Sequence, residues 1–204
     1  MRKIKNFKVN LRAKDILRSV RKLISTVDMS VELEETIQRC GCFYTRFLSP
    51  SVVYDTFLKE SLSFVCEKDI PQKWFAKSVF FVTIGSALEE EYKKNESAFG
   101  EHTGKIVSVI IAAALKQSKN FMQRIISNEA QYENCEVTKV IDIGNKYYKE
   151  ICKVISIDKI GISVGEVGTI YPKYSFAGLF YWVPSKRKKP RSNCTICSCR
   201  HTSI

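Results

Sequence analysis

Glu166 is the one carboxylate in a segment whose other residues are typical of a buried strand. Residues 165–182 read GEVGTIYPKYSFAGLFYW. Side chains alternate between the two faces of a strand, so a strand beginning at Ile160 would place Glu166 on an apolar face. Because burying an unpaired carboxylate is costly, such a residue usually has a partner, a ligand or a route to water. We expect Glu166 to accept a cationic or amine-bearing ligand in a groove, unless it bonds backbone amides or is exposed at a strand end.

The same segment carries aromatic side chains with strand spacing. Four of them share one face of the expected strand: Tyr174, Phe176, Phe180 and Trp182. Such a face could stack on a flat ring, but aromatic strand faces usually pack in a core. We therefore expect a core face, with one of the four exposed at a groove. Pro172 fits a turn, and Gly178 would allow a backbone or a ligand to approach closely.

The C-terminal run CTICSCRH places four residues of metal-ligating types within eight positions, namely Cys194, Cys197, Cys199 and His201. A C-x-x-C pair can span one metal, and thiolates favour zinc or an iron–sulfur cluster. Free thiols in a tail and a redox dithiol are the alternatives. We expect most of the other cysteines to be buried thiols. Because the chain has no catalytic triad, P-loop or G-x-G-x-x-G turn, it is not expected to be a self-contained hydrolase, kinase or dehydrogenase, and we assign no catalytic residue.

The net charge of +12 is concentrated at the two ends of the 204-residue chain. Residues 1–22 and the tail 184–204 are strongly basic, whereas the body between them is near neutral. This distribution argues against a surface built throughout for nucleic acid. The charged N-terminus does not fit a secretory signal, and the apolar run Ile106–Leu115 is too short to cross a membrane. We expect a soluble, cytoplasmic protein with reduced thiols.

The hydrophobic pattern predicts an α+β fold, with a mixed or antiparallel twisted sheet and flanking helices. Residues 1–183 are expected to form one domain, followed by the basic, cysteine-containing tail 184–204. Helices are predicted for the stripe Leu11–Ile24, for 30–42, for the run SALEEEYKK after Gly85, for 104–127 and for 146–155. Strands are predicted over 52–57, 78–84, 135–143, 160–170 and 174–183.

The order of these pieces resembles the activation domain of cobalamin-dependent methionine synthase and its short stand-alone relatives, over roughly residues 11–200. SPSVVYDTFLKE (49–60) is similar to an early strand of that family, EKDI (67–70) to a turn, and SVFFVTIGSALEEE (78–91) to its strand, glycine turn and helix. GISVGEVGTIYPKYSFAG (161–178) is similar to its "V-x-L-T-E-S … P-x-x-S-V-S-G" segment. Glu166, Pro172, Ser175 and Gly178 stand at the matching positions.

The resemblance implies a module that binds S-adenosylmethionine and docks over the corrin of a partner protein, assisting reductive remethylation of cobalamin. The vitamin B12 cofactor and the methyl transfer of methionine biosynthesis would belong to that corrinoid methyltransferase, and the electron to a flavodoxin- or ferredoxin-like donor. The implied ligand contacts are Glu166, Pro172, Ser175 and Gly178, with Phe180 from the aromatic face. Short relatives also end in a cysteine cluster, which favours a metal or redox role for the tail.

The chain departs from the family at one ligand-binding element. Family members that bind S-adenosylmethionine carry an arginine before a proline-rich Gly-Tyr loop, where this chain reads EVTKVIDIGNKYY (136–148). Lys139 could supply charge there but not the bidentate geometry of a guanidinium. The sequence therefore predicts weak binding of S-adenosylmethionine. Two other functions stay open: nucleic-acid binding through SKRKKPR (185–191) and the neighbouring cysteines, and a scaffold that binds no ligand.

Overall fold

The fold is taken from a computed structural model that describes residues 1–24, 31–61, 70–96 and 98–185. Several features singled out in the sequence lie outside these residues. They are Cys66, the first three residues of the EKDI segment, the basic run from Lys186 onward and the C-terminal cysteines Cys194, Cys197 and Cys199. None of the described helices is long and apolar enough to span a bilayer.

Six strands form one antiparallel sheet, which confirms the predicted α+β class. The order is β1-β2-β3-β8-β4, and β5 also pairs with β8. β3 and β8 lie at the centre and run together from the pair Ala76–Trp182 to the pair Thr83–Ser175. The strands are β1 (Arg2–Lys5), β2 (Ser51–Leu58), β3 (Ala76–Thr83), β4 (Cys135–Val137), β5 (Ile141–Asp142) and β8 (Ser175–Pro184).

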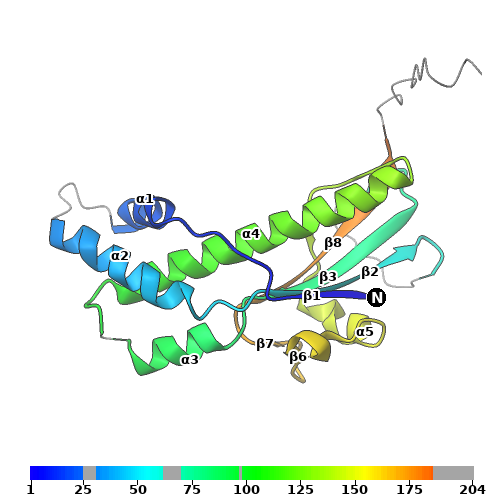
Figure 1. The fold of residues 1–204 in the computed structure, drawn as a ribbon. Helices are drawn as coiled ribbons and strands as arrows, with labels where there is room; N and C mark the ends of the chain where they lie inside the picture. Colours follow the sequence, from blue (N-terminus) through cyan, green and yellow to red (C-terminus); the bar gives the residue numbers. More distant parts are fainter. Residues whose placement is uncertain (25–30, 62–69, 97, 186–204) are drawn as a thin grey trace, which may run out of the picture.

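The long helix α4 (Thr103–Tyr132) crosses one face of this sheet (Figure 1). In its C-terminal half, Met122, Ile126 and Ala130 pack on Phe80 and Phe180 of the central strands. Its N-terminal half packs in a second cluster with three shorter helices, α1 (Ala13–Ile24), α2 (Val31–Thr45) and α3 (Ala87–Lys94). A helix was predicted at each of these four places, and the largest difference in bounds is at the C-terminal end of α4, predicted at 127 and found at Tyr132.

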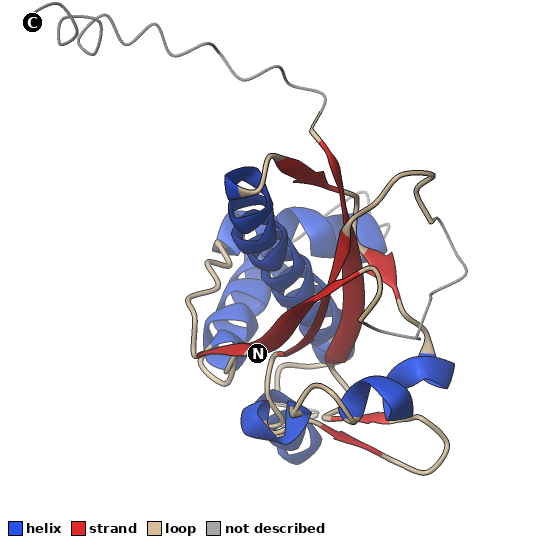
Figure 2. Cartoon of the chain, turned by 90° about the vertical axis from the view of Figure 1, so that its right-hand side faces the viewer, coloured by secondary structure: helices blue, strands red, loops and turns tan. Residues whose placement is uncertain are grey.

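The opposite face of the sheet is covered by short elements from the C-terminal half of the chain (Figure 2). Their isoleucines pack against Val79, Phe81 and Leu179 of the central strands. These elements are η1 (Asn145–Tyr147), α5 (Tyr148–Cys152), η2 (Ile157–Ile160) and the hairpin of β6 (Ser163–Val164) with β7 (Ile170–Tyr171). The sheet is therefore the middle of three layers.

The strand predicted over 160–170 is wrong. Ile160 ends η2, and residues 165–169 turn the chain between β6 and β7. The turn is closed by the Gly165 amide donating to the Thr169 carbonyl at 2.8 Å, and Gly168 adopts a φ of 79°. Ile162, Val164 and Ile170 keep the same alternating phase on the two sides of this turn, so one strand was predicted through Glu166 and Gly168, which interrupt the apolar pattern.

Two other predictions need correction. The N-terminal residues Arg2–Lys5 form the edge strand β1, although their charges had suggested only a basic end; cations on an edge strand discourage pairing with other chains. The strand expected over 135–143 is split into β4 and β5. Between them, Thr138 bonds both backbone groups of Tyr181, its hydroxyl accepting from the amide at 3.1 Å and its amide donating to the carbonyl at 3.0 Å.

Candidate functional site

Glu166 lies at the exposed turn of the β6–β7 hairpin rather than on an apolar strand face. The expectation of a semi-buried carboxylate is therefore wrong, because the chain turns at 165–169 instead of continuing as one strand over 160–170. The hairpin packs closely on η1: a Cβ added to Gly168 would stand 2.8 Å from the Asn145 carbonyl oxygen, so no larger residue fits there without a shift. Next to Glu166, the Val167 side chain is 90% exposed.

Pro172 and Ser175 connect this hairpin to the central strand β8. The Tyr171–Pro172 peptide bond is cis, as befits a sharp turn between β7 and β8. The Ser175 hydroxyl is buried and has no hydrogen-bond partner within the described residues. An unpaired buried hydroxyl is uncommon and calls for an explanation, such as a bound group or water.

β8 separates its side chains onto two faces. Ala177, Leu179 and Tyr181 pack toward α5, whereas Phe176, Phe180 and Trp182 pack toward α4. The aromatic face is thus core, as expected. Phe180 is fully buried, with its ring stacked on Phe80 at a centroid distance of 5.3 Å. This burial removes Phe180 from the surface and contradicts its expected role in stacking on a ligand ring.

Gly178 is a point of close packing on the α4 side of β8. A Cβ added there would stand 2.7 Å from the Phe176 ring and 2.8 Å from the Phe80 ring. The glycine therefore allows Phe176 to lie over the strand backbone. The close approach expected at Gly178 is made by these two rings.

Lys119 of α4 lies on the Phe176 ring, a relationship that the sequence did not suggest. Its ammonium group is 3.4 Å from the ring centroid and the side chain is half-buried. Burial lowers the pKa of Lys119, and the nearby Asp142 carboxylate partly offsets this effect. Asp142 is paired with Gly178 in the β5–β8 register, so the two residues lie side by side on the sheet. Lys119, Asp142, Phe176 and Gly178 form the "α4–β5 site".

The α4–β5 site and the hairpin lie on opposite faces of the sheet and are linked through one short segment. Asp142 of β5 accepts a hydrogen bond from the Gly144 amide at 3.0 Å, and Asn145 follows directly to contact Gly168 of the hairpin. The five ligand contacts implied by the family resemblance are therefore not one cluster. Glu166 and Pro172 belong to the hairpin side, Ser175 to the start of β8, Gly178 to the α4–β5 site, and Phe180 to the core.

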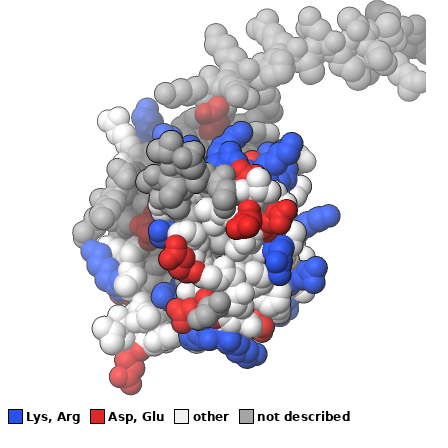
Figure 3. Space-filling view, turned by 90° about the vertical axis from the view of Figure 1, so that its left-hand side faces the viewer, with Lys and Arg blue, Asp and Glu red and all other residues white. Residues whose placement is uncertain are grey.

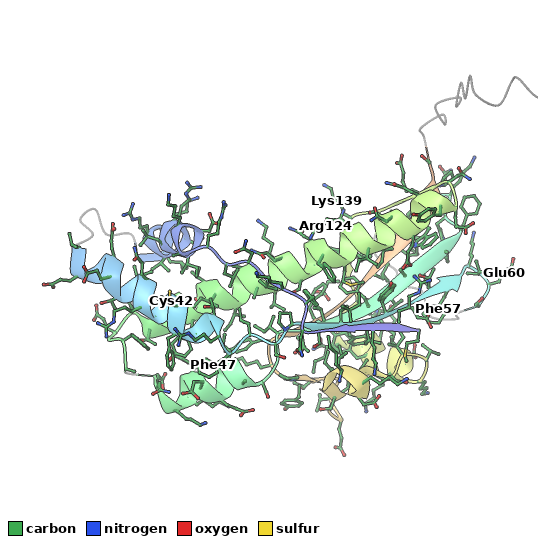
Figure 4. The ribbon with its side chains drawn as sticks, in the orientation of Figure 1. Cys42, Phe47, Phe57, Glu60, Arg124 and Lys139 are labelled. Carbon is green, nitrogen blue, oxygen red and sulfur yellow. The ribbon has the colours of Figure 1, made fainter. Side chains whose placement is uncertain are left out.

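Lys139, expected to supply charge near the ligand, is exposed in the connection between β4 and β5. Figure 4 labels it together with Arg124, which lies on the exposed side of α4. Lys119 instead lies on the Phe176 ring, and the Asp142 carboxylate acts on its pKa electrostatically. Its neighbours come from β5 and β8, far along the chain, which is why sequence spacing could not identify it.

The cysteines within the described ranges form no ligand cluster. No group of three or more His, Cys, Asp or Glu side chains suited to a metal occurs in this part of the molecule. Cys40 is fully buried, and burial raises the pKa of its thiol to about 12. Burial also raises the pKa of Cys135 and Cys152. These thiols suit a packing role, since reactive cysteines have a lowered pKa.

A buried polar network joins β2, β3 and β8 at the end of the sheet where Ala76 pairs with Trp182. The Trp182 indole donates to the Ser78 hydroxyl at 2.8 Å, and Ser78 also bonds the Thr56 hydroxyl at 2.7 Å. Nearby, the Tyr54 hydroxyl donates to Glu129 of α4 at 2.7 Å, and Arg2 of β1 pairs with the same carboxylate. Every polar group named here has a partner, so we assign the network to stability.

A comparison with solved structures supports the fold. The crystal structure of the MetH reactivation domain bound to AdoHcy superposes with a TM-score of 0.54, covering 92% of this chain and 80% of that one, at 12% sequence identity. No protein-family model matches the chain, and no curated protein matches it in sequence. The likeness therefore establishes a shared fold. It agrees with the resemblance stated from the sequence at the level of the fold.

Proposed function

We propose that this chain is an accessory activation module for a cobalamin-dependent methyltransferase such as methionine synthase. It would dock on the corrinoid protein and present S-adenosylmethionine for reductive remethylation of the cobalt. The observation that carries the proposal is the fold shared with the MetH reactivation domain across 92% of the chain. That solved domain is bound to AdoHcy, the demethylated form of the same ligand.

The proposed division of labour follows from the residues of this chain. The reacting cobalt would belong to the partner and the electron to a flavodoxin- or ferredoxin-like donor. This chain would bind and position, because the reacting groups would be supplied by those two proteins. Its part is then to hold the methyl donor and the corrinoid protein in a productive arrangement.

The β6–β7 hairpin is our candidate for the docking surface. It exposes Val167 at 90% and Tyr171 at 55%, beside the carboxylate of Glu166. Exposed apolar side chains on a short, well-anchored hairpin suit insertion into a partner surface. Gly168 anchors this hairpin against Asn145, which would keep the tip in place on docking.

Docking can be tested with the purified full chain and a cobalamin-loaded corrinoid protein from the same source. We expect a complex on gel filtration, weakened at least about tenfold by Val167→Asp, since a charge would be buried without a partner. Val31→Asp is the matched control, because Val31 is 75% exposed at the start of α2, on an element away from the hairpin. Equal weakening by both variants, or by neither, would remove the hairpin from the interface.

A further inference from the structure

We propose that Lys119 and Asp142 form a subsite for the zwitterionic amino-acid head group of an S-adenosyl ligand. Lys119 would pair with its α-carboxylate and Asp142 with its α-ammonium group. The inference rests on the proposed function for the identity of the ligand. The subsite itself is derived from the α4–β5 site.

Lys119 provides a cation that is ready to receive an anion. Its ammonium group lies on the Phe176 ring at 3.4 Å, and no hydrogen bond or ion pair joins it to another side chain among the residues described. A ring face attracts the cation but accepts none of its three N–H groups as a carboxylate oxygen would. An incoming carboxylate would satisfy these donors in a half-buried setting, where charge-assisted hydrogen bonds are strong.

Asp142 restricts what that anion can be. Its carboxylate is close enough to Lys119 to act on it electrostatically, yet the two groups do not form an ion pair within 4 Å. One of its oxygens accepts from the Gly144 amide, which orients the group. A phosphate or another simple anion would be repelled by Asp142. A ligand that carries a carboxylate and an ammonium group on the same carbon matches both charges.

The backbone around Gly178 brings these two charges together. Because Gly178 has no side chain, nothing projects from it between Asp142 on one side and the Phe176 ring above it. Phe176 in turn sets the height of the Lys119 ammonium group above the sheet. The subsite would therefore depend on three segments that are distant in sequence, namely the middle of α4, β5 and the start of β8.

This arrangement would replace the arginine that the chain lacks. A lysine presents a compact charge rather than a bidentate fork, so the carboxylate would be held by fewer fixed hydrogen bonds. We therefore expect weaker binding than a guanidinium would give, but clear selectivity for ligands with the head group.

The test compares two ligands that differ in the head group, AdoHcy and 5′-methylthioadenosine, by calorimetry on the full chain. The wild type should bind AdoHcy more tightly. Lys119→Met should lower the affinity for AdoHcy on the order of tenfold, as expected for the loss of one charged hydrogen-bonding partner. Its affinity for 5′-methylthioadenosine should be unchanged. Asp142→Asn should act in the same direction. Lys116→Met, three residues earlier on α4 and exposed, should change neither affinity.

The subsite would be overturned if the wild type bound neither ligand, or bound AdoHcy and 5′-methylthioadenosine with equal affinity. It would also be overturned if the Lys119→Met variant bound AdoHcy as tightly as the wild type does, or lost affinity for both ligands equally. Circular dichroism would establish that each variant is folded. Docking on a corrinoid protein is measured separately and without this ligand. A failed subsite with intact docking would therefore leave the accessory function standing, whereas loss of both would remove it.

Discussion

Gly178 lies directly beneath the Phe176 ring, so closely that a Cβ at this position would stand 2.7 Å from the ring edge. The Phe80 ring closes the other side at 2.8 Å. Both rings belong to the packed face under α4. A substitution at Gly178 must therefore move an aromatic ring, and the ring nearer the surface carries Lys119.

Gly178→Ala is expected to destabilise the protein by about 1–3 kcal/mol, the usual range for overpacking a core. It should also weaken AdoHcy binding, because displacing Phe176 moves Lys119. Gly41→Ala is the matched control: Gly41 lies within α2, and an added Cβ would make an ordinary 3.5 Å contact with Ile16. Replacing a helical glycine there should raise stability by about 0.5–1 kcal/mol. Urea denaturation would measure both, and equal stabilities for the two variants would refute this packing argument.

Ser78→Ala should destabilise the sheet by about 1–3 kcal/mol, because the Trp182 indole would be left as a buried donor without a partner. The Thr56 hydroxyl would lose its partner as well. Adding Trp182→Phe removes the orphaned indole, so the double variant should be less destabilised than the two single effects summed. If the free-energy effects of the two single variants simply added up in the double variant, the hydrogen bond between Trp182 and Ser78 would contribute no coupling energy.

Alkaline pH is expected to destabilise the fold through Cys40 and Tyr148. Burial raises the pKa of Cys40 from 9.0 to about 12, and burial with repulsion from Asp142 raises that of Tyr148 from 10.0 to about 12. Because the folded state keeps these protons longer than the unfolded chain does, their stabilising effect is complete below pH of about 9. It is lost as the pH rises toward about 12.

The check is the slope of unfolding free energy against pH in the alkaline range. Tyr148→Phe, which has no ionisable hydroxyl, should flatten the part of the slope above pH of about 10, and Cys40→Ala the part that begins near pH of about 9. Slopes identical to that of the wild type in both variants would mean that these buried groups do not control the alkaline transition.

The tail carries a separate prediction, since its cysteines lie beyond the described residues. If Cys194, Cys197 and Cys199 hold zinc or an iron–sulfur cluster, anaerobically purified protein should contain stoichiometric metal, and Cys197→Ser should lose it. A chain ending at Ser185 keeps all of β8 and the bond from the Ser185 amide to the Asn134 carbonyl, so it should stay folded. A full chain that is free of metal and still docks its partner would leave only the free-thiol interpretation.

The predictable parts of this fold are those in which local pattern and tertiary contact agree. The run SVFFVTI became the fully buried β3, and the long apolar segment became α4 because each residue type suits its element. β1 was missed, since its four residues show charge more clearly than alternation. The break at 165–169 was missed because Val164 and Ile170 on its two sides keep the same alternating phase, and the positive φ of Gly168 cannot be read from hydrophobicity.

The candidate site was less predictable than the fold. Glu166, Pro172, Ser175 and Gly178 were singled out by a linear motif, yet they lie on two sides of the sheet or at its edge. Lys119 carries no local signal, because its role depends on Phe176 and Asp142 from strands that meet only in the folded chain. Non-local contacts of this kind are settled by topology rather than by spacing along the sequence.

The charge distribution bears on the nucleic-acid alternative. On the side of the molecule shown in Figure 3, basic and acidic groups are interspersed rather than separated into one basic field. A nucleic-acid complex built on the basic ends should weaken steeply with salt, by about one logarithmic unit of slope per phosphate contacted. Truncation after Ser185 would then abolish it.

The most direct test of the accessory function is the visible spectrum of cob(II)alamin held by a corrinoid partner, recorded before and after addition of this chain. Docking over the corrin should change the spectrum in the manner of a lost lower axial ligand. The change should survive truncation after Ser185 and weaken with Val167→Asp or Glu166→Ala. An unchanged spectrum with every corrinoid protein encoded alongside this chain, together with a salt-sensitive RNA complex, would contradict the proposed function.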